Sequence, residues 1–307
     1  MGEGSASAAA PRGGDGCGPR AIPGNAAPAP DARPATEILA QNRRVSTPFM
    51  VAKTQRIADK AWDKFYKAHE DRFFKDRHWT DREFDELAAV ADALSGAPVL
   101  LEVGCGVGNT VHPLLEKNRA LRVHCCDFSP RAVDLVTRHP AYDAARVNAF
   151  EYDLRTCDGA ALCAALAARA WPAVTTLSLI FVLSAIPPHE HEAVLRALVD
   201  VLPAGATVVF RDYARADLAQ LRFHTRKDAQ WAEPSLLSAE RDWYRRGDET
   251  MAYFFTRDEV AALAAAVGLA GHAEDVVKTN TNRRTGAVMH RRFIQAHWQK
   301  RAAHAAP

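Results

Sequence analysis

A glycine-rich turn directly after a short apolar run constrains the fold of this chain more than any other feature. Residues 99–110 read VLLEVGCGVGNT, so the apolar run ends in Glu102 and is followed by Gly104, Gly106 and Gly108. The run predicts a buried strand, and the alternate glycines predict a tight turn into a helix. Because glycine has no Cβ, the backbone can bend sharply there and a ligand can lie against it. Such a turn after the first strand of an α/β domain is typical of a nucleotide-cofactor site.

The spacing of the glycines distinguishes between nucleotide cofactors. The dinucleotide fingerprint G-x-G-x-x-G ends on a glycine at the start of the helix, but Asn109 stands there when the count begins at Gly104. The pattern E-x-G-x-G-x-G instead resembles the first motif of class I methyltransferases that use S-adenosylmethionine (SAM). Residues 122–127 (RVHCCD) predict a second strand that ends in Asp127, whose carboxylate can accept hydrogen bonds from both ribose hydroxyls. The alternatives are a glycine turn that binds nothing and a nicotinamide enzyme.

Strand and helix patterns alternate from about residue 97 onward. Strands are expected near 98–103, 122–127, 146–151, 173–181 and 206–212, and helices over 108–118, 130–138, 158–170 and 189–201. The alternation predicts βαβ units and a parallel sheet. After an insertion at about 213–255, we expect a helix near 257–267 and a hairpin with strands near 271–279 and 287–298. The expected fold class is α/β: a Rossmann-like class I methyltransferase domain over 96–301, with a seven-stranded, mostly parallel sheet and an antiparallel C-terminal hairpin.

The segments on either side of this domain differ in composition. Residues 1–36 are rich in Gly, Ala, Pro and Ser, which predicts a disordered tail, and residues 302–307 form a second short tail. Residues 37–95 interleave charges with large aromatics, of which Trp62, Phe65 and Tyr66 share one helix face. We expect a helical N-terminal extension that packs on the core or serves as a lid and RNA-binding region.

The distribution of charge and of cysteine residues limits the kinds of partner and metal site that the chain can have. The formal net charge is only +2, yet residues 276–307 contain no Asp or Glu and seven Lys or Arg. A basic hairpin on a near-neutral protein favours contact with phosphate backbones, and a solubilising tail is the alternative. The six cysteines make no C-x-x-C pair, and the two histidines of residues 189–192 (HEHE) stand two apart, so no metal site is expected. No apolar stretch is long enough to span a bilayer.

Side chains after the third and fifth predicted strands are further candidates for the site. Asp153 can accept a hydrogen bond from the adenine amine, with Leu154 and Ile180 on the two faces of the ring; alternatively it caps the next helix. The segment 210–217 (FRDYARAD) ends the fifth strand, next to the expected cofactor crevice. Its charged side chains are candidates for substrate contact, or else form an ion pair at the sheet edge. They are Arg211, Asp212 and Asp217.

Six segments together resemble one enzyme family over residues 55–301. They are residues 62–66 (WDKFY), 73–79 (FFKDRHW), 180–186 (IFVLSAI), 210–213 (FRDY), 219–223 (AQLRF) and 244–248 (YRRGD). They resemble the eukaryotic methyltransferase-like enzymes that make 3-methylcytidine in the anticodon loop of tRNA. The resemblance implies that SAM is held by Trp62, Tyr66, Gly104, Gly106, Asp127, Asp153, Leu154 and Ile180. The expected RNA contacts are Lys75, Arg77, Arg215, Arg283, Arg284, Arg291 and Arg292.

The expected reaction needs little acid–base chemistry. Cytosine N3 carries an in-plane lone pair at neutral pH, so it can attack a sulfonium methyl group without a strong general base once the cytosine is unpaired. A carboxylate would stabilise the positive charge that develops, and Asp212 or Asp217 is expected there, with Arg211 ordering them or holding a phosphate. The alternatives are a SAM-binding RNA subunit without its own activity and a small-molecule methyltransferase.

The resemblance also implies the partners. We expect tRNA modified at position 32 and, as a candidate accessory protein, seryl-tRNA synthetase or another partner. The chain is expected to be a monomer. A cytoplasmic location is expected. A nuclear location is the first alternative, and a mitochondrial location has less support.

Overall fold

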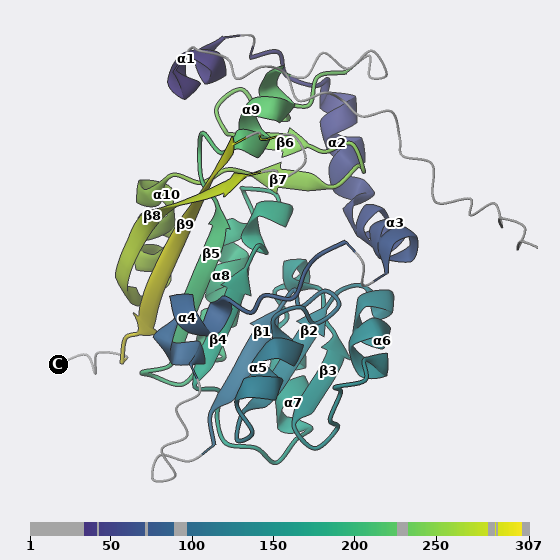
Figure 1. Cartoon of the computed structure of the whole chain (residues 1–307), viewed down its shortest axis with the longest axis vertical. Coiled ribbons are helices and arrows are strands. Elements are labelled where there is room, and N and C mark those ends of the chain that lie inside the picture. The colour runs from purple at the N-terminus through teal and green to yellow at the C-terminus, as the bar shows by residue number, and fades with distance from the viewer. Residues whose placement is uncertain are drawn as a thin grey trace, which may run out of the picture. The chain divides into compact units, whose positions relative to one another are not determined.

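A single seven-stranded sheet forms the centre of the chain (Figure 1). The computed structural model describes residues 34–302 apart from residues 42, 71–72, 89–96, 226–232, 282–285 and 287. The strands are β1 (Val99–Val103), β2 (Arg122–Asp127), β3 (Val147–Glu151), β4 (Thr176–Ile180), β5 (Thr207–Tyr213), β8 (Leu269–Thr281) and β9 (Val288–Lys300). Their order is β3-β2-β1-β4-β5-β9-β8, with β1 to β5 parallel and β9 antiparallel to both its neighbours. The expected sheet and hairpin are confirmed.

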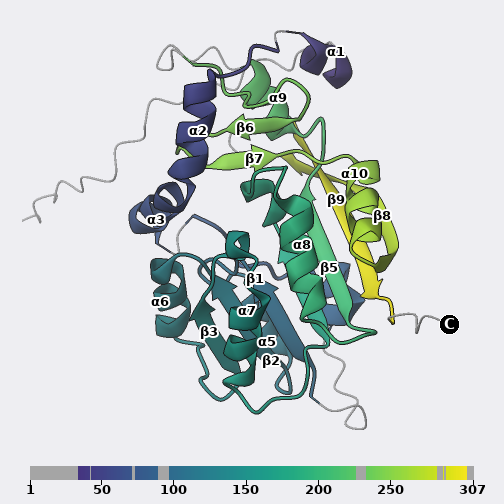
Figure 2. The ribbon, with the colours of Figure 1, turned by 180° about the vertical axis from the view of Figure 1, so that it is seen from behind.

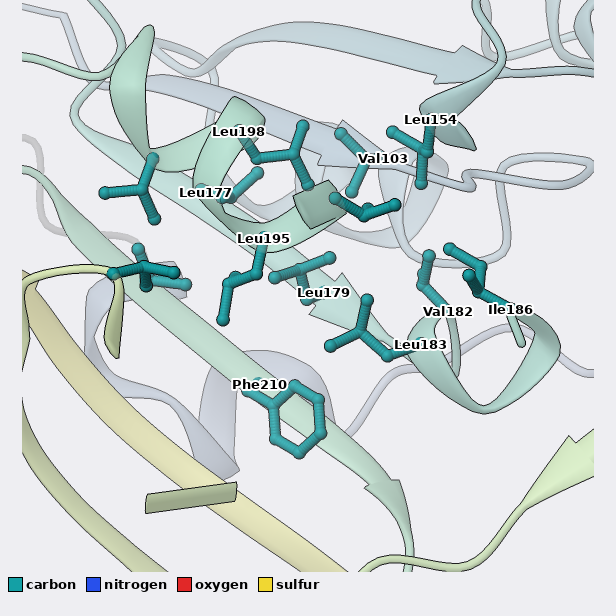
Figure 3. Packing of buried hydrophobic residues seen from close by; sticks show 14 of the residues in the cluster. Val103, Leu154, Leu177, Leu179, Val182, Leu183, Ile186, Leu195, Leu198 and Phe210 are labelled. Carbon is teal, nitrogen blue, oxygen red and sulfur yellow. The ribbon is translucent and has the colours of Figure 1, made fainter. Parts of the chain in front are cut away.

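Helices cover both faces of the sheet, as Figures 1 and 2 show from opposite sides. On one face are α5 (Val111–Lys117) and α6 (Pro130–Arg138), and on the other α7 (Gly159–Ala167), α8 (His191–Asp200) and α10 (Arg257–Ala266). Side chains alternate along β1: Leu100 packs toward α5, whereas Leu101 packs toward α8. All five β1 residues are buried, as expected for a parallel strand covered on both faces. Figure 3 shows Leu177, Leu179 and Leu195 within the α8 side of this core.

The N-terminal extension is helical. It consists of α1 (Ala35–Ala40), α2 (Pro48–Arg56), α3 (Ala58–His69), α4 (Thr80–Glu83) and a 3-10 turn (Asp85–Leu87). The buried side of α3 packs on the glycine turn and α6, because Phe65 and Tyr66 form a cluster with Val107 and Ala132. The tail expected over residues 1–36 lies outside the described residues except at its last positions, where α1 already begins at Ala35.

The insertion after β5 folds together with this extension. It contains α9 (Leu218–Thr225), β6 (Trp243–Arg245) and β7 (Met251–Tyr253), which pair as a second small sheet. The backbone N–H of Ser46 donates to the carbonyl of Leu236 at 2.8 Å, and Arg43 pairs with Asp242 at 3.3 Å. Figure 1 shows α1, α2, α9, β6 and β7 together at the end of the molecule toward which β4 and β5 point. The sequence pattern did not predict this second sheet.

Candidate active site

The glycine turn after β1 has a backbone that only glycine adopts without strain. Gly104 and Gly106 have φ angles of +59° and +55°. A Cβ at Gly104 would lie 3.0 Å from Val182, and one at Gly106 would lie 3.1 Å from the Tyr66 hydroxyl. Both glycines border cavities, so the turn leaves room for a ligand where a side chain would otherwise stand.

Two adjoining cavities lie at this turn, beyond the carboxyl ends of β1, β2 and β4. The narrow cavity has a volume of 90 Å³ and runs from the turn toward Asp127, Asp153 and Leu154. The wide cavity has a volume of 390 Å³ and extends toward β5, β9 and the insertion. They share the residues that stand between them. The shared residues are Trp62, Tyr66, Gly104, Phe181 and Ala185.

Asp127, the last residue of β2, places a carboxylate on the narrow cavity. Its two oxygens accept the backbone N–H groups of Gly106 and Ser129, each at 3.0 Å. Burial raises the pKa of Asp127 to about 6, against the lowering effect of these two hydrogen bonds. Each oxygen keeps a second acceptor position, so the ionised carboxylate can accept two further hydroxyl donors. These two free acceptor positions fit the two hydroxyl groups of the ribose in an adenosine cofactor.

The far end of the narrow cavity is formed after β3. Asp153 accepts the backbone N–H of Arg155 at 2.9 Å and caps a 3-10 turn (Leu154–Thr156), so its expected capping role exists. It also lines the cavity together with Leu154, which leaves its other oxygen able to accept from an adenine amine. Ile180 is placed differently from the expectation, because its side chain is buried in the core beside Leu100 and Val209. Strand alternation turns it to that face, and Phe181, Val182 and Ile186 form this part of the wall instead.

Helix α3 covers both cavities. Trp62 and Tyr66 lie one turn apart, with ring centroids 6.1 Å from each other, and both line the two cavities. On the same helix, Asp63 accepts the Ser129 hydroxyl at 3.1 Å, and Asp59 lies 3.8 Å from Arg155. These contacts hold the helix against β2 and the turn after β3.

The wide cavity combines aromatic rings with cations. Its rings include Phe73, Phe74, Trp79, Phe181, Tyr213 and Phe293, and its cations are Lys75, Arg77, Arg246 and Arg291. Among the described residues that line it there is no Asp or Glu. Aromatic faces and guanidinium planes bind unstacked nucleobases, and the cations suit phosphate groups. The cavity therefore has the composition of a single-stranded nucleic-acid site.

Arg77, expected as an RNA contact, lines the wide cavity, and its guanidinium also makes contacts within the protein. It donates to the Thr110 hydroxyl at 3.0 Å and to the carbonyl of Ile180 at 3.3 Å, and it lies 3.9 Å from Glu102. Burial raises the pKa of Glu102, and Arg77 opposes that shift. The guanidinium thus supports the acid of the glycine motif, and because Arg77 also lines the wide cavity, its contact with RNA phosphate stays a prediction.

Asp217 and Arg211 support the wide cavity from behind. Asp217 is fully buried, and its carboxylate accepts the Arg291 Nε at 2.8 Å and the backbone N–H of Arg292 at 2.7 Å. Arg211 donates to Gln295 at 3.1 Å and lies against the rings of Trp79 and Phe293, 4.4 and 4.8 Å from their centroids. Neither residue lines the narrow or the wide cavity, so the structure does not place them at the expected substrate contacts. Each forms an ion pair instead, Asp217 with Arg291 and Arg211 with Glu83 at 3.3 Å.

Asp212 does not line the wide cavity itself, but it contacts two residues that do. Its oxygens accept the backbone N–H groups of Ser184 and Tyr213, each at 2.9 Å. Burial raises the pKa of Asp212 to about 6, against the lowering effect of the backbone N–H groups of Ser184 and Tyr213. Ser184 and Tyr213 both line the cavity.

Of the other expected RNA contacts, Lys75 and Arg291 line the wide cavity. Lys75 is exposed at its rim, while Arg215 pairs with Asp242 at 3.0 Å and Arg292 with Asp275 at 3.4 Å. Arg283 and Arg284 lie outside the described residues. Within the part of the chain that the structure describes, no group of three His, Cys, Asp or Glu side chains could hold a metal ion, and no helix is long and apolar enough to cross a membrane.

Sequence reasoning missed several residues of the wide cavity. Phe293 lies on β9, which pairs antiparallel with β5 and places Phe293 opposite Tyr213. This pairing joins residues 80 positions apart, and no local pattern indicates it. Arg246 lies after β6 in the second sheet, which was also not predicted. Phe181 and Ser184 belong to the segment 180–186, which carried the family resemblance, but neither was assigned a role.

Comparison with known proteins agrees with this geometry. Residues 101–208 match the family model described as "Methyltransferase domain". The chain is 41% identical to the tRNA N(3)-methylcytidine methyltransferase trm141 of Schizosaccharomyces pombe, over 82% of this chain and 96% of that protein. It is 39% identical to the tRNA N(3)-cytidine methyltransferase METTL6 of Mus musculus, over 88% of this chain and 91% of that protein.

A solved structure supports the fold. A SAM-dependent methyltransferase from Anabaena variabilis matches with a TM-score of 0.55 and 13% identity, over 80% of this chain and 95% of that one. At this identity the match establishes the Rossmann-like fold alone, whereas the sequence relatives define the family. The chain therefore belongs to the family of tRNA N(3)-methylcytidine methyltransferases.

Proposed function

We propose that the protein is a SAM-dependent methyltransferase that forms 3-methylcytidine at position 32 of the tRNA anticodon loop. The observation that carries this proposal is the pair of adjoining cavities, one suited to adenosine and one to a nucleobase, with a shared wall. The family relatives, which are named as tRNA N3-cytidine methyltransferases, supply the substrate class and the modified atom.

The narrow cavity is the proposed SAM site. Asp127 would accept the ribose hydroxyls, and Asp153 with Leu154 would bind the adenine. Trp62 and Tyr66 of α3 would close the site from the other side and exclude water. When bound, SAM supplies an electrophilic methyl group on a sulfonium centre. The glycine turn supports this assignment, since a Cβ at Gly104 would fill the space between the two cavities.

The wide cavity is the proposed site of the extruded cytidine. Its aromatic rings can stack on the base and hold its plane, so that the N3 lone pair points in a fixed direction. No strong general base is needed, because N3 is unprotonated. A carboxylate near the ring stabilises the positive charge of the product, and Asp212 is the proposed carboxylate. Neither Asp212 nor Asp217 lines the cavity itself. Asp212 is preferred because it contacts the lining residues Ser184 and Tyr213, whereas Asp217 is already paired with Arg291.

Three of the proposed RNA contacts line the wide cavity, Arg77 among them. Lys75 stands at its rim, and Arg291 presents a guanidinium that Asp217 holds in place. Arg215 is exposed and Arg292 is partly exposed, and both lie close in sequence to residues that line the cavity. Each already has an acidic partner on the surface. Surface ion pairs of this kind are weak, so phosphate groups can compete for these side chains. We keep Arg283 and Arg284 as proposed contacts on charge alone.

The experiment uses the purified full chain, methyl-labelled SAM and unmodified tRNA. Nucleoside mass spectrometry should detect 3-methylcytidine, and reverse transcription should stop next to position 32, because N3 methylation blocks pairing. A tRNA with adenosine at position 32 should remain unlabelled. Label at a different position would contradict the assignment of position 32, and a product other than 3-methylcytidine would contradict the proposed reaction.

The alternatives are tested by adding a partner and by removing charge. If label appears only when seryl-tRNA synthetase or another protein is present, an accessory partner is required. If the partner labels tRNA without this chain, this chain is a non-catalytic subunit. Truncation before β8 cannot test for a small-molecule enzyme, because β8 and β9 complete the sheet. Replacing Arg292 with Gln is the better test, since a small-molecule enzyme would keep full activity. We further propose a cytoplasmic monomer, to be checked by sedimentation and fractionation.

A further inference from the structure

We propose that Asn109, the residue directly after the glycine turn, is a positioning residue that holds the loop of residues 73–79 in register with the cofactor site. The proposal rests on the proposed function, since it takes an RNA base as the occupant of the wide cavity. It gives a role to a position that the sequence already singled out, because Asn109 stands where the dinucleotide fingerprint has its last glycine.

The loop of residues 73–79 forms much of the wide cavity. It lies between α3 and α4 and belongs to no helix or strand. Five of its residues line the cavity: Phe73, Phe74, Lys75, Arg77 and Trp79. A loop without the hydrogen bonds of a helix or a strand needs other partners for its backbone groups. The position of these rings and cations therefore depends on the contacts that hold the loop.

The Asn109 side chain holds the first half of this loop. Its NH₂ group donates to the Asp76 carboxylate at 3.1 Å and to the carbonyl of Phe74 at 3.4 Å. Both partners can only accept, so the NH₂ group must face them and the amide keeps one orientation. Among the described residues, neither partner accepts a hydrogen bond from any other donor. The backbone adds a third contact, because the Arg77 N–H donates to the Asn109 carbonyl at 2.8 Å.

The turn that carries Asn109 is itself firmly held. The Gly108 N–H donates to the Cys105 carbonyl, and the Cys105 N–H donates to the carbonyl of Cys126 on β2, each at 3.0 Å. Asn109 is 9% exposed and lines the wide cavity, whereas Gly104, where the turn begins, borders both cavities. One short turn thus borders the proposed SAM site and holds the loop that faces the base.

This link matters because methyl transfer needs three atoms in line. The base N3, the methyl carbon and the sulfur must be aligned, and a misplacement of about 1 Å can cost about 100-fold in rate. The narrow cavity would hold SAM, while the loop would set the position of the base. Asn109 fixes the loop relative to the turn, so we expect it to act on the reaction with tRNA and to have little effect on cofactor affinity.

The test exchanges the two hydrogen-bonding side chains. Asn109→Asp removes the donor and places a second carboxylate against Asp76 and the Phe74 carbonyl. We expect kcat/KM for an anticodon stem-loop to fall at least about tenfold, as for the loss of one hydrogen bond to a charged group. Asp76→Asn alone keeps a neutral acceptor, so it should cost less than about fivefold.

The double variant carries both substitutions and has the net charge of wild type. Its amide at position 76 can donate to its carboxylate at position 109, which restores the contact with the direction reversed. Asp76 is exposed, so the exchange does not disturb the core. We expect kcat/KM to return to within about threefold of wild type, although each substitution alone lowers it.

Hydrogen exchange of the loop gives a readout that needs no RNA. Asn109→Asp should increase the exchange rate of the amides in residues 73–79, and the double variant should restore slow exchange. Titration with S-adenosylhomocysteine, the demethylated product of SAM, should give a Kd within about threefold of wild type for each variant, because Asn109 does not line the narrow cavity.

Asn148→Asp is the matched control. Asn148 is also 9% exposed, and its NH₂ group donates to the carbonyl of Ala165 at 3.0 Å, but it lines neither cavity. We expect it to lower the midpoint of thermal unfolding to a similar extent as Asn109→Asp. It should nevertheless leave kcat/KM and the exchange of residues 73–79 unchanged, which separates positioning from general stability.

Two outcomes would overturn the role of Asn109. One is a double variant whose loss of kcat/KM equals the product of the two single losses, and the other is a loop that exchanges equally fast in Asn109→Asp and in wild type. If wild type transfers no methyl group to tRNA, the proposed reaction fails, and the exchange measurements still decide whether Asn109 positions the loop.

Discussion

Replacing Asp127 with Asn tests the cofactor site most directly. The carboxylate accepts two backbone N–H groups and keeps one acceptor position on each oxygen for the ribose. The amide has one oxygen, so it must turn its NH₂ toward one backbone donor and loses one ribose acceptor together with the charge. A hydrogen bond to a charged group contributes about 1.5–3 kcal/mol. We therefore expect the Kd for S-adenosylhomocysteine to rise about 10- to 150-fold.

The same substitution should affect folding far less than binding. Burial raises the pKa of Asp127 to about 6 from 3.8, so keeping it ionised at pH 7.5 costs the folded state about 3 kcal/mol. Asn removes this cost, which offsets the lost hydrogen bond of about 1–3 kcal/mol. We expect the unliganded variant to unfold within about 2 kcal/mol of wild type, while the thermal stabilisation by S-adenosylhomocysteine largely disappears.

Calorimetric titration and thermal unfolding give the two readouts. Asp134→Asn is the matched control, because Asp134 makes a surface pair with Arg138 on the same helix-and-strand unit. It should bind S-adenosylhomocysteine like wild type. If Asp127→Asn binds within threefold of wild type, the ribose assignment is refuted, and with it the use of the narrow cavity for SAM.

Three further predictions concern pH, stability and RNA affinity. Asp127 accepts both hydroxyls only when it is ionised, so affinity for S-adenosylhomocysteine should be constant above about pH 7 and fall up to tenfold per pH unit below about pH 6. Titrations from pH 5 to 8 will measure this dependence, and a flat profile would contradict it. Arg77→Met leaves Glu102 buried without its partner, so urea unfolding should reveal a loss of about 3–5 kcal/mol, and a loss under about 1 kcal/mol would sink this reading. Asp217→Asn should release Arg291 and weaken tRNA binding several-fold with unchanged affinity for S-adenosylhomocysteine, whereas an equal loss of both would indicate a general folding defect.

The sequence by itself determined the central sheet and the cofactor end of the site. Strands β1 and β2 are short apolar runs bounded by glycine or an acid, and period and turn chemistry are local properties. Gly104 follows β1 directly and Asp127 is the last residue of β2. Parallel strands place such residues at one edge of the sheet. The motif and the topology rule together were enough to bring Asp127 to the glycine turn.

Only the tertiary structure decided which charged residues face the substrate. Sequence reasoning assigned Arg211 and Asp217 to catalysis, yet neither lines the two cavities. Each is paired within the protein, Arg211 with Glu83 and Asp217 with Arg291. These roles depend on the direction of side chains at the end of a strand and on the antiparallel pairing of β9 with β5. The pairing brings Phe293 to the cavity and Arg291 to Asp217. Such pairings join residues many positions apart, so they depend on long-range packing and leave no trace in local patterns.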